Sequence, residues 1–338
     1  MSEIDAILDA AADLRARSEP FALATVVDVR GSSYRRPGAR LLVPPSGAPI
    51  GLISGGCLEE EAARLAREAL MLDAPVLVTV DHSDENDELW GLGLGCRGVI
   101  ELLAEPPALA AETLAALADA RAGMATFLLT GLDGERRRLT ALEAGALGER
   151  AAVAVGHGRP AVIGDEVLDP ILPPLHLVVC GAGPDASPLA AAGARLGWRV
   201  SVVDPRRSLL RSERFPGAAL HDVDPGQAAE AVGAGEWTAA VLMSHDYLRD
   251  AAFLASLLGR GVPYLGILGP RDRTDRLLAG LEVGPTDADL VALHAPAGLD
   301  IGADGAEEVA AAIVSEILAV LRGRSGVPLR DRPGPIHG

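Results

Sequence analysis

The spacing of apolar residues predicts a mixture of helices and strands in the first half of the chain. Apolar side chains from Ile4 to Leu14 recur at the spacing that lines one face of a helix, which predicts a helix over 1–17. Runs rich in apolar and β-branched residues that end at glycine, serine or proline predict strands. Strands are expected at 21–29, 39–43, 49–53, 76–80, 99–103, 126–130, 151–155 and 161–163, and helices at 58–72 and 108–122.

In the second half the pattern changes to strands that alternate with helices. The clustered prolines of Asp169–Pro174 predict a linker, because proline stiffens the chain and interrupts helix and sheet. The apolar strands that follow are expected at 175–180, 199–203, 239–243 and 263–268. Their alternation with helical segments indicates a parallel doubly wound sheet. The sequence therefore predicts an α/β protein with an N-terminal mixed α/β cofactor domain, residues 1–174, and a C-terminal Rossmann-like domain with a tail, residues 175–338.

The turn after the first strand of the second domain has the G-x-G-x-x-A form of a phosphate-binding turn. Gly181 is expected to make the bend, and Gly183 to let a pyrophosphate approach. Asp204 ends the next strand 23 positions after Gly181, close to where a carboxylate binds a ribose hydroxyl, and Arg206 suits a 2′-phosphate. These residues predict bound NAD(P), and the alternative is a turn that only packs a helix on a strand.

His245 follows the strand at 239–243, at the edge of the sheet where ligands bind in open α/β folds. It is therefore expected to face a ligand. An equally good interpretation is that His245 or Asp246 caps a helix beginning near Tyr247. The three arginines between 271 and 276 are likewise either an anion clamp or a solvated helix face.

Two cysteines in glycine-rich settings are the main chemical candidates of the first domain. Gly55 and Gly56 precede Cys57 at the start of a predicted helix, where unpaired amides favour a thiolate and a nearby phosphate. Gly95 and Cys96 form a second segment of this kind. The alternative for each cysteine is a small buried side chain beside a tight turn.

The loop after the predicted strand at 21–29 carries Ser32, Ser33 and Arg35, whose hydroxyls and guanidinium suit an anionic group. The alternative is a set of ordinary surface charges in a hairpin connection. No Ser-His-Asp grouping, metal-ligand cluster or carboxylate pair stands out as a reaction centre. The first domain is therefore expected to bind rather than to catalyse.

Composition and charge narrow the setting. A formal net charge of −17 with no basic stripe argues against nucleic acid as a partner. The most apolar helical stretch, Val309–Leu321, is too short to span a bilayer. The 3 cysteines argue against a disulfide framework, and Cys180 ends an apolar strand where burial is expected. Because the start of the chain has no signal-peptide pattern, the cytoplasm is the expected location.

Several ordered segments together resemble the XdhC/CoxI family of accessory proteins, which mature molybdenum enzymes of the xanthine dehydrogenase and carbon monoxide dehydrogenase type. The segments that carry the resemblance are residues 24–38, 54–59, 93–98, 181–186, 203–206, 294–302 and 334–337. The chain departs from the commoner family form at Pro184, where histidine is usual, and proline removes an amide donor from the turn. Arg97 also stands where glycine is frequent.

The resemblance implies a chaperone that binds the molybdenum cofactor (molybdopterin) and shields it while a cysteine desulfurase installs the sulfido ligand. The protein would then hand the cofactor to a client molybdoenzyme, and it is expected to be a homodimer. Cys57 would contact the molybdenum or carry sulfur, and Cys96 would assist. Two other interpretations stay open: an NAD(P)-dependent oxidoreductase with His245 as acid or base, and a docking scaffold whose Rossmann half has lost its ligand.

Overall fold

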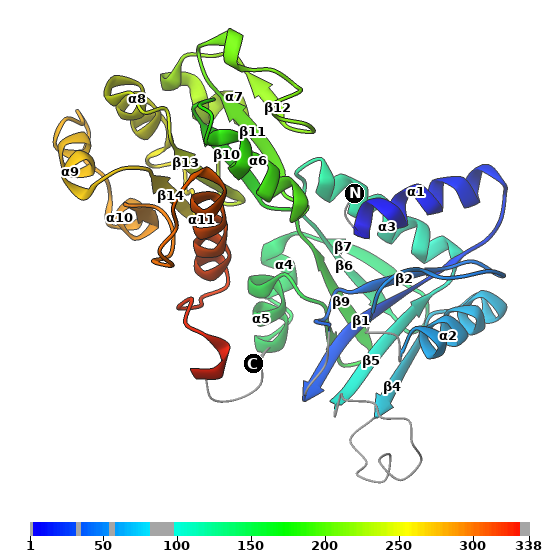
Figure 1. Cartoon of the computed structure of the whole chain (residues 1–338). Coiled ribbons are helices and arrows are strands. Elements are labelled where there is room, and N and C mark those ends of the chain that lie inside the picture. Colours follow the sequence, from blue (N-terminus) through cyan, green and yellow to red (C-terminus); the bar gives the residue numbers. More distant parts are fainter. Residues whose placement is uncertain (1–2, 32–34, 54–57, 82–97, 332–338) are drawn as a thin grey trace. The chain divides into compact units, whose positions relative to one another are not determined.

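The chain forms two compact units, one reaching to Pro173 and the other spanning Pro174–Asp331 (Figure 1). The computed structural model describes residues 3–31, 35–53, 58–81 and 98–331. The first unit combines helices with antiparallel sheets, and the second is built on a parallel sheet. The predicted fold class is therefore confirmed.

The first unit contains a five-stranded antiparallel sheet with the order β3-β2-β1-β5-β4. Its strands are β1 Ala22–Gly31, β2 Arg40–Val43, β3 Ile50–Gly51, β4 Val76–Asp81 and β5 Gly98–Glu105. Helices cover both faces: α1 Glu3–Ala16, α2 Glu59–Leu72 and α3 Pro107–Arg121.

Side chains alternate between the two faces of this sheet, as the strand pleat requires. Ala24 and Val26 of β1 pack with Ala62 and Ala66 of α2 on one face. Leu23 of β1 packs with α1 and α3 on the other. Because both faces of β1 are buried, the strand reads as a continuous apolar run rather than as an alternating one.

A second antiparallel sheet with the order β7-β6-β9-β8 completes the first unit. Its elements are β6 Thr126–Gly131, β7 Arg136–Leu139, α4 Ala141–Gly145, α5 Glu149–His157, β8 Ala161–Ile163 and β9 Glu166–Ile171. The strand predicted at 151–155 is wrong, because these residues belong to α5. Ala151 and Ala154 are buried one helical turn apart, and Gly158 ends the helix in the left-handed conformation. A short apolar run alone does not separate the two structures.

The predicted linker at Asp169–Pro174 is also partly wrong, because its first three residues are the end of strand β9. Pro170 pairs with Phe127 of β6, while β8 accompanies β9 only as far as Leu168. Pro170 therefore lies where β9 has a partner on one side only, a position that tolerates the missing N–H.

The second unit has a parallel six-stranded sheet with the order β12-β11-β10-β13-β14-β15. Its strands are β10 His176–Cys180, β11 Arg199–Val203, β12 Ala219–His221, β13 Thr238–Leu242, β14 Tyr264–Ile267 and β15 Leu293–His294. Its helices are α6 Ala186–Arg195, α7 Ala228–Val232, α8 Tyr247–Leu257, α9 Arg271–Ala279, α10 Asp287–Ala292 and α11 Ala306–Leu321. Counted from β10, the order is 3-2-1-4-5-6, which is characteristic of dinucleotide-binding folds.

Helices bury both faces of this parallel sheet. On one face, Leu177 and Val179 of β10 pack with α6 and α11, which Figure 1 shows side by side. On the other face, Val178 and Cys180 pack with α7 and α8. The strand order reverses between β10 and β13, and the carboxyl ends of these two strands are the usual place for a ligand in such sheets.

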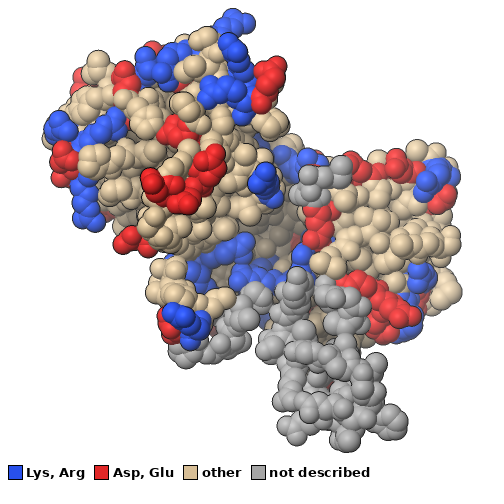
Figure 2. Space-filling model, viewed as in Figure 1, with Lys and Arg blue, Asp and Glu red and all other residues tan. Residues whose placement is uncertain are grey.

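The surface carries charges of both signs, interspersed over the visible face of each unit (Figure 2). The side chains coloured blue are all arginines, because the chain contains no lysine. Among the described residues, no helix is long and apolar enough to cross a membrane. Within the same ranges, no group of three or more His, Cys, Asp and Glu side chains could hold a metal ion.

Candidate functional site

Two of the segments that carry predicted site residues attach to the same end of the five-stranded sheet. Gly31, the last residue of β1, is the register partner of Gly98, the first residue of β5. Asp81, the last residue of β4, is paired with Val99. The predicted site residues on these segments, Ser32, Ser33, Gly95 and Cys96, lie outside the described residues.

The strand that precedes a third segment points toward this end of the sheet. Strand β3 is antiparallel to β2, which is antiparallel to β1, so β3 points the same way as β1. After Ile53 the chain enters the segment with Gly55, Gly56 and Cys57, which lie outside the described residues. Leu58, the first described residue after this segment, is buried in the core that α2 forms with the sheet. The point at which the chain leaves the segment is therefore fixed by packing.

Arg35 is held by Glu3, a residue for which the sequence predicted no functional role. The Arg35 guanidinium donates to Glu3 Oε2 over 2.7 Å, and both side chains are about one-third exposed. The other carboxylate oxygen of Glu3 accepts a hydrogen bond from the Leu52 amide. Glu3 therefore ties the loop after β1 to the stretch that leads to Cys57. If Arg35 binds an anionic group, as the sequence predicts, its guanidinium must contact that group and the Glu3 carboxylate at the same time.

In the Rossmann-like unit the structure brings the five predicted residues together at the carboxyl edge of β10, β11 and β13. Gly181 has φ +117°, a conformation that favours glycine. A Cβ there would lie 2.7 Å from the Ser244 Cα, so the glycine also allows a close crossing of two loops. The Ala182 amide donates to Asp204 Oδ2 over 2.7 Å, which fixes the turn against the end of β11.

Asp204 is fully buried, and its own chain engages both carboxylate oxygens. The Arg206 side chain donates to Oδ1 over 2.9 Å and to Oδ2 over 2.7 Å, and the Arg206 amide donates to Oδ1 as well. Burial alone would raise the pKa of Asp204, but the hydrogen bonds from Arg206 and Ala182 outweigh it and leave the pKa below its usual value. Asp204 is therefore an ionised anchor for the turn.

His245 interacts with Asp185, the residue that precedes α6. His245 Nε2 lies 2.6 Å from Asp185 Oδ2, and the imidazole is 61% exposed. His245 has φ +58°, a backbone conformation that few non-glycine residues adopt. Of the two capping residues proposed from the sequence, Asp246 is the one that caps α8, by accepting the Arg249 amide over 3.0 Å.

Sequence reasoning missed two residues that shape this edge, Arg214 and Asp250. Arg214 donates to the carbonyls of Ala182 and Gly183 over 3.0 and 2.7 Å and so holds the turn from outside. Asp250 is fully buried, and it accepts the Ser244 hydroxyl and the Arg273 guanidinium. Arg273 is thus part of an internal ion pair rather than a solvated helix face. Arg214 lies more than 30 positions along the chain from the turn that it holds, so no local pattern marks it.

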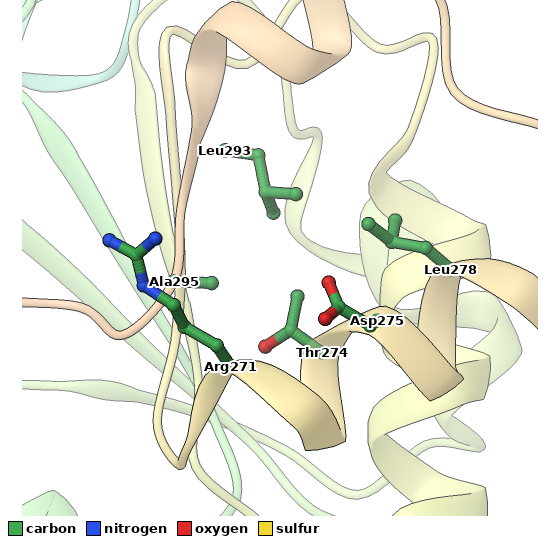
Figure 3. A pocket seen from close by; sticks show the side chains of 6 residues that line it. All are labelled: Arg271, Thr274, Asp275, Leu278, Leu293 and Ala295. Carbon is green, nitrogen blue, oxygen red and sulfur yellow. The ribbon is translucent and has the colours of Figure 1, made fainter.

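A hollow of about 240 Å³ lies elsewhere in this unit, between the start of α9 and strand β15 (Figure 3). Its lining is mostly polar, with Arg271 and Asp275 adding one charge of each sign, and the residues that line it are Arg271, Thr274, Asp275, Leu278, Leu293 and Ala295. Of the arginines that the sequence offered as an anion clamp, Arg271 lines it, and none of the residues predicted to bind a cofactor does.

Cys180 is buried on the α7 and α8 side of the parallel sheet, as expected. Burial, together with the nearby negative charge of Asp250, raises the pKa of the Cys180 thiol well above its usual range. The thiol therefore stays protonated and unreactive in the folded protein.

The fold defines a two-unit α/β protein in which an antiparallel-sheet unit precedes a Rossmann-like unit. The family model described as the XdhC and CoxI family matches residues 14–81, and that of the XdhC Rossmann domain matches residues 177–317. A Bacillus subtilis protein named as a probable xanthine dehydrogenase subunit is 32% identical over 334 residues, covering 94% of this chain and 97% of that protein. The chain belongs to the XdhC and CoxI family.

Two further relatives cover most of the chain. An Escherichia coli protein named molybdenum cofactor insertion chaperone PaoD is 26% identical over 301 residues, covering 88% of this chain and 82% of that protein. A crystal structure described as a xanthine dehydrogenase from Bacillus halodurans has a TM-score of 0.75 at 28% identity and covers 98% of both chains. The likeness therefore extends over both units.

Proposed function

We propose that this protein is an accessory factor that binds the molybdenum cofactor, protects it during sulfuration and inserts it into a xanthine dehydrogenase-type enzyme. Membership of the XdhC and CoxI family supports this function, as does similarity to a protein named as a molybdenum cofactor insertion chaperone. In this proposal the cofactor is cargo that the protein passes on. The partners are a client molybdoenzyme and a cysteine desulfurase.

One observation of the structure carries the proposal. The register pair Gly31 and Gly98 attaches two segments to one end of a single sheet, and strand β3, whose Gly51 is level with Ala24 of β1, points toward that end before the third segment begins. These segments hold the serines, the glycine-flanked Cys57 and the glycine-flanked Cys96. Serine hydroxyls and glycine amides suit the phosphate of molybdopterin, and thiolates suit its soft metal end. We propose that Cys57 contacts the metal end or carries sulfur and that Cys96 assists.

Cofactor retention by cysteine variants tests this assignment. The protein is purified from cells that synthesise the molybdenum cofactor, and bound molybdenum and the fluorescent oxidation product of the pterin are quantified. We expect Cys57→Ala to lose at least about tenfold in retained cofactor, the effect of about 1.4 kcal/mol in binding, and Cys96→Ala to lose less. The matched control is Cys180→Ala, which removes a buried thiol from the other unit. Equal retention by all three variants would contradict the proposed site.

Transfer is tested separately from binding. Loaded protein is mixed with a cofactor-free client enzyme and a cysteine desulfurase, and client activity is followed. We expect activation to require all three components, and Cys180→Ala to activate as well as the unchanged protein. Activation that proceeds equally with free cofactor would refute a role in protection and insertion.

The same proposal includes a homodimer in the cytoplasm. Light scattering on the purified protein measures the molar mass. Twice the chain mass of 34.8 kDa is the expected value, and a monomer at micromolar concentration would contradict it.

A further inference from the structure

The fold of the Rossmann-like unit is one that commonly binds a dinucleotide. The residues of its glycine turn can therefore be compared with those that pyrophosphate binding requires. A phosphate-binding turn supplies backbone N–H groups at a helix N-terminus and a glycine face that the phosphates can reach. The site must also be free of negative charge, because like charges at close range repel. The turn from Gly181 to Pro188 fails each of these requirements.

Amide donors are scarce in this turn. Pro184 and Pro188 have no N–H, one before α6 and one in its first turn. The Ala182 N–H is already bonded to Asp204, and the Ala186 N–H donates to the Gly183 carbonyl over 3.3 Å. Few donors are therefore left for a phosphate where α6 begins.

The face of Gly183 is covered by side chains of the protein itself. A Cβ built on Gly183 would lie 2.7 Å from Asp185 Oδ1 and 3.9 Å from the His245 ring. Asp185 Oδ1 is buried and has no hydrogen-bond partner among the described residues, while Oδ2 is held by His245. The space that the missing side chain was expected to leave open is thus filled by a carboxylate.

This carboxylate also occupies the electrostatically favourable place. Asp185 immediately precedes α6, where the helix dipole stabilises an anion, and its side chain is only 20% exposed. The acid expected to bind the ribose is likewise unavailable, because Ala182 and Arg206 engage both oxygens of buried Asp204. The residues present do not fit NAD(P).

We infer that the glycine turn is closed to dinucleotides because the Asp185 carboxylate, held over Gly183 by His245, takes the place of the pyrophosphate. Pro184 and Pro188 reinforce the closure by removing amide donors. This closure concerns the Rossmann-like unit alone and goes beyond the proposed handling of molybdenum cofactor. It removes the basis for a hydride-transfer reaction at this turn.

Calorimetric titration of the full chain with NAD, NADP and inorganic pyrophosphate tests the closure. The unchanged protein is expected to show no saturable binding of any of the three. Saturable binding of NAD or NADP that the Asp185→Arg variant leaves unchanged would mean that a dinucleotide site exists elsewhere. Saturable binding that this variant alters would mean that the turn is open. The second result overturns the inference, whereas the first leaves the turn closed and supports it.

A second measurement asks whether the named residues cause the closure. The triple variant Pro184→Ala, Asp185→Ala and Pro188→Ala removes the carboxylate and restores two amide donors. We expect it to bind pyrophosphate at least about tenfold more tightly than the unchanged protein, equivalent to about 1.4 kcal/mol, because one close negative charge is lost and two amide donors are gained. A folded triple variant without this gain would overturn the inference.

Two single variants keep the test decisive if the triple variant does not fold. Asp185→Asn preserves the size of the side chain and removes only its charge, so a smaller gain in pyrophosphate binding is expected. Asp272→Asn makes the same change of charge at a 75% exposed position on α9 and should give no gain. Equal pyrophosphate binding by these two variants would contradict the role of Asp185.

Discussion

Ser201 lies between two histidines on one face of the parallel sheet. The His176 Nε2 is 2.8 Å and the His221 Nε2 is 3.2 Å from the Ser201 hydroxyl oxygen. Burial lowers the pKa of both imidazoles. The pKa of His176 falls to about 4, because the charges of Arg199 and His221 add to the effect of burial there. Both rings are therefore neutral near pH 7, and the hydroxyl can donate to one ring and accept from the other.

Mild acid should consequently destabilise the protein through His176. In the unfolded chain this imidazole binds a proton below about pH 6.5, whereas the folded protein binds it only near pH 4. The unfolded state binds more protons between these values, so the free energy of unfolding falls as the pH drops from about 6.5 to about 4, by on the order of 3 kcal/mol. Urea unfolding across this pH range measures the decline.

The variant His176→Asn should make this decline shallower. His157→Asn, at an exposed position on α5, controls for the loss of one histidine. If the unchanged protein and both variants lose stability equally between pH 6.5 and 4, burial of His176 is not the cause.

At the scale of elements, two buried ion pairs join the sheets of the first unit. Arg40 of β2 donates to both carboxylate oxygens of Asp169 in β9, over 3.0 and 2.8 Å. Arg136 of β7 is paired with Glu105 at the end of β5. Burial raises the pKa of Glu105, and the charges of Arg136 and Arg40 oppose that shift. The two sheets are thus connected by charges that water does not reach.

Replacing one residue of such a pair should destabilise the folded protein more than replacing both residues by apolar ones. Asp169→Ala leaves Arg40, which is 4% exposed, buried without its partner, so a loss of about 3–5 kcal/mol is expected. The double variant Arg40→Met with Asp169→Leu replaces both charges by apolar groups and should recover much of this loss. Denaturant unfolding of the two variants provides the comparison, and equal stability would show that no unpaired charge is involved.

At the scale of the whole molecule, the apolar cores fall into two sets. Within the described residues, the clusters of the first unit and those of the Rossmann-like unit have no member in common. Each unit therefore has the means to be stable by its own packing.

A cavity made in the core of one unit should accordingly lower the stability of that unit alone. Ile313 of α11 is fully buried against the parallel sheet, and Ile313→Ala should destabilise the Rossmann-like unit by about 2–5 kcal/mol. Amide hydrogen exchange followed by mass spectrometry should show faster exchange in peptides from β10 and β11. Peptides from β5 and β6 serve as the internal reference, and equally faster exchange there would show that the two units unfold together.

The sequence alone determined the elements with long, consistent patterns. Strands β1, β10, β11 and β13 and helices α2 and α3 follow from apolar runs and helical spacing, because local pattern and burial agree there. The family also follows from the sequence, since its motifs are ordered along the chain. Short segments were misjudged where neighbours decide, as at 151–155 and at Asp169–Ile171, because a short apolar run fits either structure and a proline is tolerated where one side of a strand is unpaired.

For the sites, the sequence determined which residues gather and the tertiary structure decided what those residues can do. Gly181, Gly183, Asp204, Arg206 and His245 do meet at one edge of the sheet. Only the structure shows that the Asp185 carboxylate covers Gly183 and that the Arg206 guanidinium is hydrogen-bonded to Asp204. A motif records which residue types are present, whereas the availability of a carboxylate or an amide depends on hydrogen bonds between residues distant in the chain. Those bonds form only when the strands come together.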